Sequence, residues 1–170
     1  DPLGSHVITW IEGNQGGSDF ALCDPADAKS VNCAWGVGDG QRTLNFWAHS
    51  SKGDTSEMSS VGLSVDSTNP TGSLTVSETP NAAGWYRGAT VTANGSDSLS
   101  GVAGRWVQVN GGAQQAGPVS LYTSGIYTVN GVVRDNAGNQ IATAPMTLNV
   151  DTVAPIVTVI PDRAPDGGSW

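Results

Sequence analysis

Residues 125–139 read Gly-Ile-Tyr-Thr-Val-Asn-Gly-Val-Val-Arg-Asp-Asn-Ala-Gly-Asn, a run rich in β-branched residues that ends in a cluster of turn-forming ones. β-Branched side chains favour extended backbone, whereas Asp, Asn and Gly accept the conformations that tight turns need. Alternation along the run puts Val129, Gly131 and Val133 on one face. The segment is therefore expected to form a core strand followed directly by a turn.

Shorter runs of the same kind recur along the chain, for example in residues 74–77 and 89–93, with turn residues between them. No window keeps helical spacing for three turns, because Gly or Pro interrupts nearly every segment that is long enough. This pattern predicts an all-β fold of the sandwich type.

The composition of the 170 residues narrows the classes of partner. Hydrophobic residues make up 38% of the chain, enough to bury a core, and the formal net charge is −8. A negative balance repels phosphate backbones and anionic lipids, so nucleic acid is not an expected partner. No apolar stretch approaches the roughly 18 to 20 residues that cross a bilayer, so membrane insertion is not expected.

The chain repeats itself at a spacing of 85 residues, which aligns residues 65–70, Val-Asp-Ser-Thr-Asn-Pro, with residues 150–155, Val-Asp-Thr-Val-Ala-Pro. Upstream, the same spacing pairs Thr43 with Thr128, Asn45 with Asn130, Gly53 with Gly138 and Leu63 with Leu148. Nearer the start the spacing grows to about 96, where Trp10 falls on Trp106, so about eleven residues are inserted in the first copy.

The repetition predicts three parts. Residues 1–66 form an incomplete repeat with a Cys-bearing insertion at about 18–36, residues 67–151 a complete repeat, and residues 152–170 the first strand of a third. The first part lacks counterparts of residues 70–96, and a half-sandwich with an open apolar face is unstable alone. We therefore expect something outside the first copy to cover it.

The whole repeat resembles the bacterial immunoglobulin-like (Big-type) tandem repeats of extracellular and surface proteins. The resemblance rests on the Val-Asp-x-x-x-Pro junctions, Gly84-Trp-Tyr86, Ser96-Asp-x-x-Ser-Gly-Val102 and the run at 125–139. It implies tandem immunoglobulin-like sandwiches used as a stalk, spacer or adhesin-type array, or appended to secreted enzymes. It also implies an extracellular or cell-surface location.

Two aromatic residues have expected structural roles in the complete repeat. Tyr127, on the strand before the turn at 135–139, resembles a tyrosine corner, in which the hydroxyl bonds to nearby backbone. Trp106 is expected to be the core tryptophan of this repeat, with Trp10 as its counterpart.

The two cysteines, Cys23 and Cys33, enclose nine residues of a polar loop, and no histidine lies within metal-ligand spacing of either. This arrangement favours a disulfide over a metal site and indicates an oxidising compartment. The insertion that carries them is absent from the complete repeat. It is therefore where an individual recognition surface is expected.

No residue pattern predicts an enzyme. His6 and His49 lie far apart in the sequence, and no Ser or Cys near either has the context of a nucleophile. We expect no catalytic residue and no cofactor.

Aspartates at turns and junctions leave one metal alternative open. Asp66, Asp97, Asp135 and Asp151 are first interpreted as turn and capping residues. If they converge where repeats meet, their oxygens would suit a hard cation such as Ca²⁺.

The leading functional hypothesis is a non-catalytic spacer whose partners are neighbouring repeats of the same protein. A second is a filament subunit that assembles head to tail with further copies of itself. In this hypothesis residues 156–170 add a strand through Val157, Val159 and Ile160.

A third hypothesis is an accessory carbohydrate-binding module of a secreted enzyme. Flat exposed rings stack on sugar faces, so a carbohydrate or host ligand would contact aromatic residues. The candidates are Trp35, Trp47, Trp85 and Tyr86.

Overall fold

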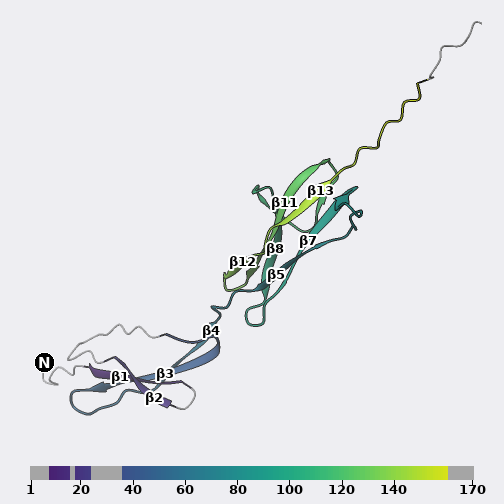
Figure 1. Cartoon of the computed structure of the whole chain (residues 1–170). Coiled ribbons are helices and arrows are strands. Elements are labelled where there is room, and N and C mark those ends of the chain that lie inside the picture. Colours follow the sequence, from purple (N-terminus) through teal and green to yellow (C-terminus); the bar gives the residue numbers. More distant parts are fainter. Residues whose placement is uncertain (1–7, 16–17, 24–35, 161–170) are drawn as a thin grey trace, which may run out of the picture. The chain divides into compact units, whose positions relative to one another are not determined.

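The computed structural model describes residues 8–15, 18–23 and 36–160, the first two segments by their backbone alone (Figure 1). All the regular secondary structure in these ranges consists of β-strands, which confirms the predicted all-β class. Consistently, the described residues contain no helix of the length and hydropathy that a membrane span requires.

The first sheet holds β1 to β4 in the order β2-β1-β3-β4, with antiparallel neighbours throughout. The strands are β1 (Ile8–Gln15), β2 (Ser18–Cys23), β3 (Gly40–Ser50) and β4 (Ser59–Val65).

Two further sheets are built from the rest of the chain. A three-stranded sheet, in the order β10-β7-β5, contains β5 (Thr71–Val76), β7 (Ala89–Ser96) and β10 (Val119–Leu121). A six-stranded sheet, in the order β6-β13-β11-β8-β9 with β12 paired to β11, contains β6 (Trp85–Tyr86), β8 (Val102–Val109), β9 (Gln114–Ala116), β11 (Gly125–Asp135), β12 (Gln140–Ala142) and β13 (Met146–Val150).

The chain divides into two compact units. The first contains the residues up to Thr71 together with Gly95–Gly104 and Val133–Ile141, and the second contains Gly72–Asn94, Arg105–Val132 and the residues from Ala142 onward. The division at residues 66 and 151 rests on sequence repetition and stays a prediction.

The hydrophobic core lies in the second unit, where side chains of the three-stranded sheet pack against those of the six-stranded sheet. Its buried members are Ala89, Val91, Ala93, Val107, Leu121, Val129, Leu148 and Val150. A Cβ added at Gly131 on β11 would lie 3.2 Å from a Leu74 methyl carbon on β5 and 3.3 Å from the Ala93 Cβ on β7. The two sheets therefore meet face to face as a sandwich, and glycine permits their close approach.

The prediction that Trp106 is the core tryptophan is wrong. Val107, the next residue on β8, is fully buried in the core, whereas Trp106 is half-buried and outside it. Because successive side chains of a strand point to opposite faces, an error of one residue exchanges core for surface.

The tyrosine corner is present. The Tyr127 hydroxyl donates a hydrogen bond to the main-chain oxygen of Thr123 at 2.8 Å, and the ring packs against the core. This bond ties the start of β11 to the preceding turn.

The sheets of the two units share a strand order at the spacing found in the sequence. β3 and β11 begin at Gly40 and Gly125, a difference of 85, and β4 ends at Val65 where β13 ends at Val150. The order β2-β1-β3-β4 of the first sheet therefore corresponds to β9-β8-β11-β13 of the six-stranded sheet.

One face of the first sheet is apolar, and its side chains on β3 and β4 are more exposed than those of the core. Register pairs Leu44 with Val61, and Phe46 of β3 lies on the same face. Phe46 is 36% exposed and Val61 40% exposed, and no residue of β3 or β4 is buried. Leu63, which corresponds to fully buried Leu148, is only half-buried.

Candidate functional site

Three aspartates predicted as cation candidates come together in the first unit. Asp66 directly follows β4, Asp97 directly follows β7, and Asp135 is the last residue of β11. One carboxylate oxygen from each lies within 4.8 Å of the others. Residues separated by about 30 to 70 positions thus form one acidic cluster, which we call the aspartate cluster.

Asp135 is held by the turn that follows it. Its side chain is 1% exposed, and Oδ1 accepts hydrogen bonds from the main-chain N–H groups of Gly138 at 2.7 Å and Asn139 at 2.8 Å. Oδ2 accepts a third bond from Asn139 Nδ2 at 2.8 Å. Gly138 has a φ of 101°, which only glycine adopts without strain. The local sequence Asp-Asn-Ala-Gly-Asn therefore fixes this carboxylate in the chain's own turn.

Asp97 is positioned in a similar way but keeps one oxygen available. Its Oδ1 accepts from the main-chain N–H groups of Leu99 at 3.0 Å and Gly101 at 2.9 Å. Within the described part of the chain, no donor is recorded for Oδ2. This oxygen can therefore bind a ligand without losing an existing bond.

Asp66 links the junction segment to the loop after β7. Its Oδ2 accepts from the Ser100 N–H at 3.0 Å and its Oδ1 from the Thr68 N–H at 3.0 Å, while Asn139 Nδ2 donates to its main-chain oxygen. The Ser100 hydroxyl is the largest cause that holds the pKa of Asp66 below its ordinary value, and the Ser100 N–H makes a smaller contribution in the same direction. The bond from Thr68 acts in the same direction, so this carboxylate is ionised at neutral pH.

A fourth carboxylate, that of Asp39, binds the two junction residues that follow Asp66, namely Ser67 and Thr68. It accepts hydrogen bonds from the Ser67 N–H at 2.8 Å, the Ser67 hydroxyl at 2.7 Å and the Thr68 hydroxyl at 2.7 Å. The Ser67 hydroxyl and then the Thr68 hydroxyl are the main causes that lower the pKa of Asp39. The junction is therefore bonded through its backbone and its side chains.

The same contacts recur 85 residues later, in the second unit. Ser124 replaces Asp39, and its hydroxyl oxygen accepts from the Thr152 N–H at 2.9 Å and lies 3.1 Å from the Thr152 hydroxyl. Asp151 repeats the turn of Asp66, because its Oδ1 accepts from the Val153 N–H at 2.9 Å. Asp151, the fourth predicted cation candidate, belongs to this turn and not to the aspartate cluster.

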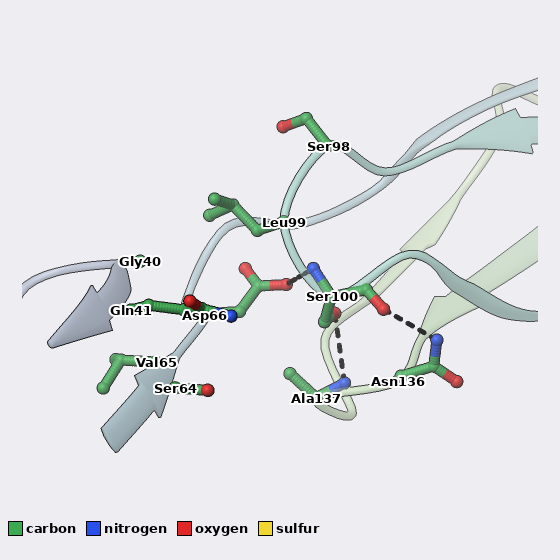
Figure 2. Close-up of a pocket in the computed structure, with 10 residues that line it drawn as sticks. All are labelled: Gly40, Gln41, Ser64, Val65, Asp66, Ser98, Leu99, Ser100, Asn136 and Ala137. Carbon is green, nitrogen blue, oxygen red and sulfur yellow. Dashed lines mark hydrogen bonds between the residues drawn. The ribbon is translucent and has the colours of Figure 1, made fainter. Parts of the chain in front are cut away.

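A pocket of about 370 Å³ adjoins Asp66 in the first unit (Figure 2). Its lining comes from the ends of β3 and β4 and from the loops after β7 and β11, and consists of Gly40, Gln41, Ser64, Val65, Asp66, Ser98, Leu99, Ser100, Asn136 and Ala137. Figure 2 shows Ser100 at its centre: its N–H donates to Asp66, and its main-chain oxygen accepts from Asn136 Nδ2 at 2.7 Å. Neither Ser100 nor Asn136 is predicted from the sequence as a site residue. In the sequence, the Ser-Gly at 100–101 and the Asn at 136 indicate only turns.

The chemistry of this region suits an oxygen-seeking cation. Three carboxylates close together repel one another unless a cation or hydrogen bonds offset their charges, and Ca²⁺ binds oxygen ligands of this kind. The aspartate cluster contains no His or Cys, and no nucleophile with an adjacent base lines the pocket. The three carboxylates are therefore a donor set that could hold a metal ion.

The other predicted site residues are dispersed. Trp85 lines a groove in the second unit, whereas Tyr86 packs against the core. Trp47 lies on β3, is half-buried and interacts with another group of the chain. Trp35 and Cys33 lie outside the described residues, so the disulfide with Cys23 stays a prediction.

The strand-exchange candidates are highly exposed. Val157, Val159 and Ile160 have exposed fractions of 84, 86 and 81%, in a segment without assigned secondary structure. Their pairing with another chain stays a prediction.

Comparison with known proteins leaves the family open. No protein-family model and no curated protein sequence matches the chain. A structure of Clostridium thermocellum CbhA fibronectin(III)-like modules is similar over 86% of this chain and 79% of its own, with 16% identity and a TM-score of 0.40.

Two other solved structures are more distant. Dimeric latent PorU from Porphyromonas gingivalis has 15% identity and a TM-score of 0.34, and the similarity covers 88% of this chain but 17% of PorU. SGBP-B from the Bacteroides ovatus mixed-linkage glucan utilization locus has 11% identity and a TM-score of 0.25, covering 85% of this chain and 60% of its own. Identities and scores this low carry no argument about function.

Proposed function

We propose that this chain is a non-catalytic structural segment of a bacterial extracellular or cell-surface protein, built from tandem immunoglobulin-like sandwiches of the Big type. The observation that carries the proposal is the repeated junction. Asp39 with Ser67 and Ser124 with Thr152 make the same contacts at positions that differ by 85 residues. A junction built twice in the same way suits a spacer, because each copy is attached to the next by a short segment with few degrees of freedom.

The competing filament hypothesis also has a specific observation in its favour. At the 85-residue spacing, residues 156–160 correspond to the beginning of β5, and Val159 corresponds to Leu74, which packs against the core. The first sheet has an apolar face that such a strand would partly cover.

Two features weaken the filament hypothesis. β5 pairs with β7 alone in its sheet, so a donated counterpart of β5 would have no strand of this kind to join in the first sheet. Phe46 also occupies the position of Gly131, whose lack of a side chain permits the close approach of Leu74. A donor strand would therefore meet a phenylalanine ring where the second unit has space.

The experiment that separates the two is the mass in solution with and without residues 156–170. A spacer is expected to be monomeric in both forms by light scattering across a hundredfold range of concentration. Concentration-dependent oligomers that vanish in the truncated chain would replace the spacer proposal with the filament. A Val159→Asp variant, which keeps the length, serves as the matched control for truncation.

A second proposal concerns the aspartate cluster, which is a candidate Ca²⁺ site that braces the junction. Asp66, Asp97 and Asp135 would supply the ligands, and among the described residues no hydrogen-bond donor contacts Asp97 Oδ2. The cation would offset two of the three negative charges and tie the junction residue to two loops.

We expect Ca²⁺ to raise the midpoint of thermal unfolding by several degrees relative to EDTA. A ligand present at about a hundred times its Kd stabilises the folded state by about 2.7 kcal/mol. Asp97→Asn should abolish the shift, whereas Asp151→Asn, which changes a turn outside the cluster, should preserve it. Equal midpoints with millimolar Ca²⁺ and with EDTA would exclude the cation site and leave the spacer proposal standing.

A further inference from the structure

The second unit carries an open groove of about 630 Å³ that is separate from the aspartate cluster. Its lining comes from the segment between β5 and β7 and from the residue after β10, and consists of Glu78, Thr79, Pro80, Asn81, Trp85, Arg87, Gly88 and Tyr122. The volume is in the range of sites for small ligands. Trp85 is 39% exposed and Tyr122 60% exposed, so two aromatic rings face solvent in one groove.

The Tyr122 ring is held against glycine and a carboxylate. A Cβ built at Gly88 would lie 2.3 Å from two carbons of this ring, so the ring occupies the space that any other residue at 88 would fill. Its hydroxyl donates to Glu78 Oε1 at 3.4 Å. The ring is therefore placed by the fold although most of it is exposed.

Trp85 is positioned by a turn closed by Asn81. Asn81 Oδ1 accepts from the N–H groups of Ala83 and Trp85, each at 3.0 Å, and Asn81 N–H donates to the Trp85 main-chain oxygen at 2.8 Å. β6 then continues from Trp85 into the six-stranded sheet beside β13. The indole thus projects from a backbone that is fixed on both sides, which lowers the entropy cost of binding.

The polar groups of the groove are mainly donors. Glu78 is an acceptor whose capacity is used internally, because Oε2 accepts from the Ser77 hydroxyl and the Thr90 N–H, both at 2.6 Å. The Ser77 hydroxyl, followed by the Thr90 N–H, lowers the pKa of Glu78. No hydrogen bond to another described residue is recorded for the Arg87 guanidinium or for Asn81 Nδ2.

We propose that this groove binds a neutral glycan chain of β-1,4-linked pyranoses. In β-1,4-linked glucose and xylose units the hydroxyls are equatorial and axial C–H groups lie on both faces, which stack on flat aromatic rings. Trp85 and Tyr122 supply the rings, while Arg87 and Asn81 supply donors to the ring and hydroxyl oxygens. The lining contains one acidic and one basic side chain, Glu78 and Arg87, and so has no net formal charge, which favours a neutral sugar over an acidic one.

A peptide suits the groove less well than a glycan. An ordinary peptide has no regular flat C–H faces to stack on the Trp85 and Tyr122 rings. A proline-rich peptide, which also docks on aromatic residues, is kept as a competing outcome.

The test uses the full chain and titrates it with cellohexaose, a soluble β-1,4-linked glucose hexamer, by following tryptophan fluorescence and calorimetry. We expect saturable binding that Trp85→Ala weakens about tenfold or more. Gly88→Ala should weaken it as well, because its methyl group must displace the Tyr122 ring. Phe46→Ala, which removes an exposed ring far from the groove in sequence, is the matched control and should bind as the parent chain does.

Three results would overturn the proposal. These are no binding of cellohexaose at about 10 mM, equal binding by the Trp85→Ala variant, and tighter binding of a polyproline decamer than of the sugar. Circular dichroism and the unfolding midpoint of each variant identify any loss that comes from misfolding. Arg87→Ala changes an exposed groove residue outside the core and should also weaken binding; unchanged binding would remove Arg87 from the site.

Discussion

Asp135→Ala is expected to lower the free energy of unfolding by about 3 kcal/mol. The wild-type carboxylate is almost completely buried and accepts three hydrogen bonds from Gly138 and Asn139. Alanine leaves these donors without their acceptor in a turn that connects β11 to β12. Relief of repulsion from Asp66 and Asp97 offsets part of the loss, so the expected value lies below the sum for three charged hydrogen bonds. Urea unfolding followed by tryptophan fluorescence measures it.

Asp135→Asn separates hydrogen bonding from charge. The amide oxygen keeps the bonds from the two main-chain N–H groups, but the amide nitrogen faces the Asn139 Nδ2 donor and loses one bond. A loss of about 1 kcal/mol is expected for this variant. Asp151→Ala, an exposed aspartate with a single recorded bond, is the control and should change stability by less than about 1 kcal/mol. If Asp135→Ala and Asp151→Ala were equally mild, the buried turn would not contribute as argued.

Leu148→Ala is expected to destabilise the chain by about 2 to 5 kcal/mol, whereas Leu63→Ala should cost about 1 kcal/mol or less. The two leucines occupy equal positions in the repeated sequence. Leu148 is 1% exposed between two sheets, and its truncation leaves a cavity among packed side chains. Leu63 is half-buried on a sheet face with no buried neighbour on β3 or β4, so its truncation leaves little cavity.

The same denaturation experiment tests the pair, with both variants made in the full chain. A large loss for Leu63→Ala would mean that something covers the first sheet in solution. Adding the truncation of residues 156–170 to Leu63→Ala then distinguishes a donated strand from another cover. A small loss for Leu148→Ala would contradict the sandwich core itself.

The candidate site was foreseen only in part. Asp66, Asp97 and Asp135 could be singled out because each stands beside Gly, Ser or Asn at the end of a β-rich run, where aspartate accepts backbone hydrogen bonds. Their convergence could not be foreseen, because it depends on how three distant strand ends are placed by pairing and packing. Asp151 stands in the same Val-Asp-x-x-x-Pro pattern as Asp66 and forms the same local turn, yet it is outside the cluster.

Other residues of the two sites gave no usable sequence pattern. Ser100 acts through its backbone N–H, which every residue except proline possesses. In the sequence, Tyr122 is one of several aromatic residues. Only the structure shows its ring packed against Gly88. The error at Trp106 has a related cause, since strand register decides which of two adjacent residues faces the core.

Local chemistry fixed the strands, the turns and the repeated junction of this chain, because side-chain branching, proline and glycine act over a few residues and leave their spacing in the sequence. Packing alone decided which leucine of an equivalent pair is buried, which aspartates meet and which rings share a groove. These properties depend on the second layer that lies over each sheet, and a repeat in the sequence carries no information about whether that layer is present.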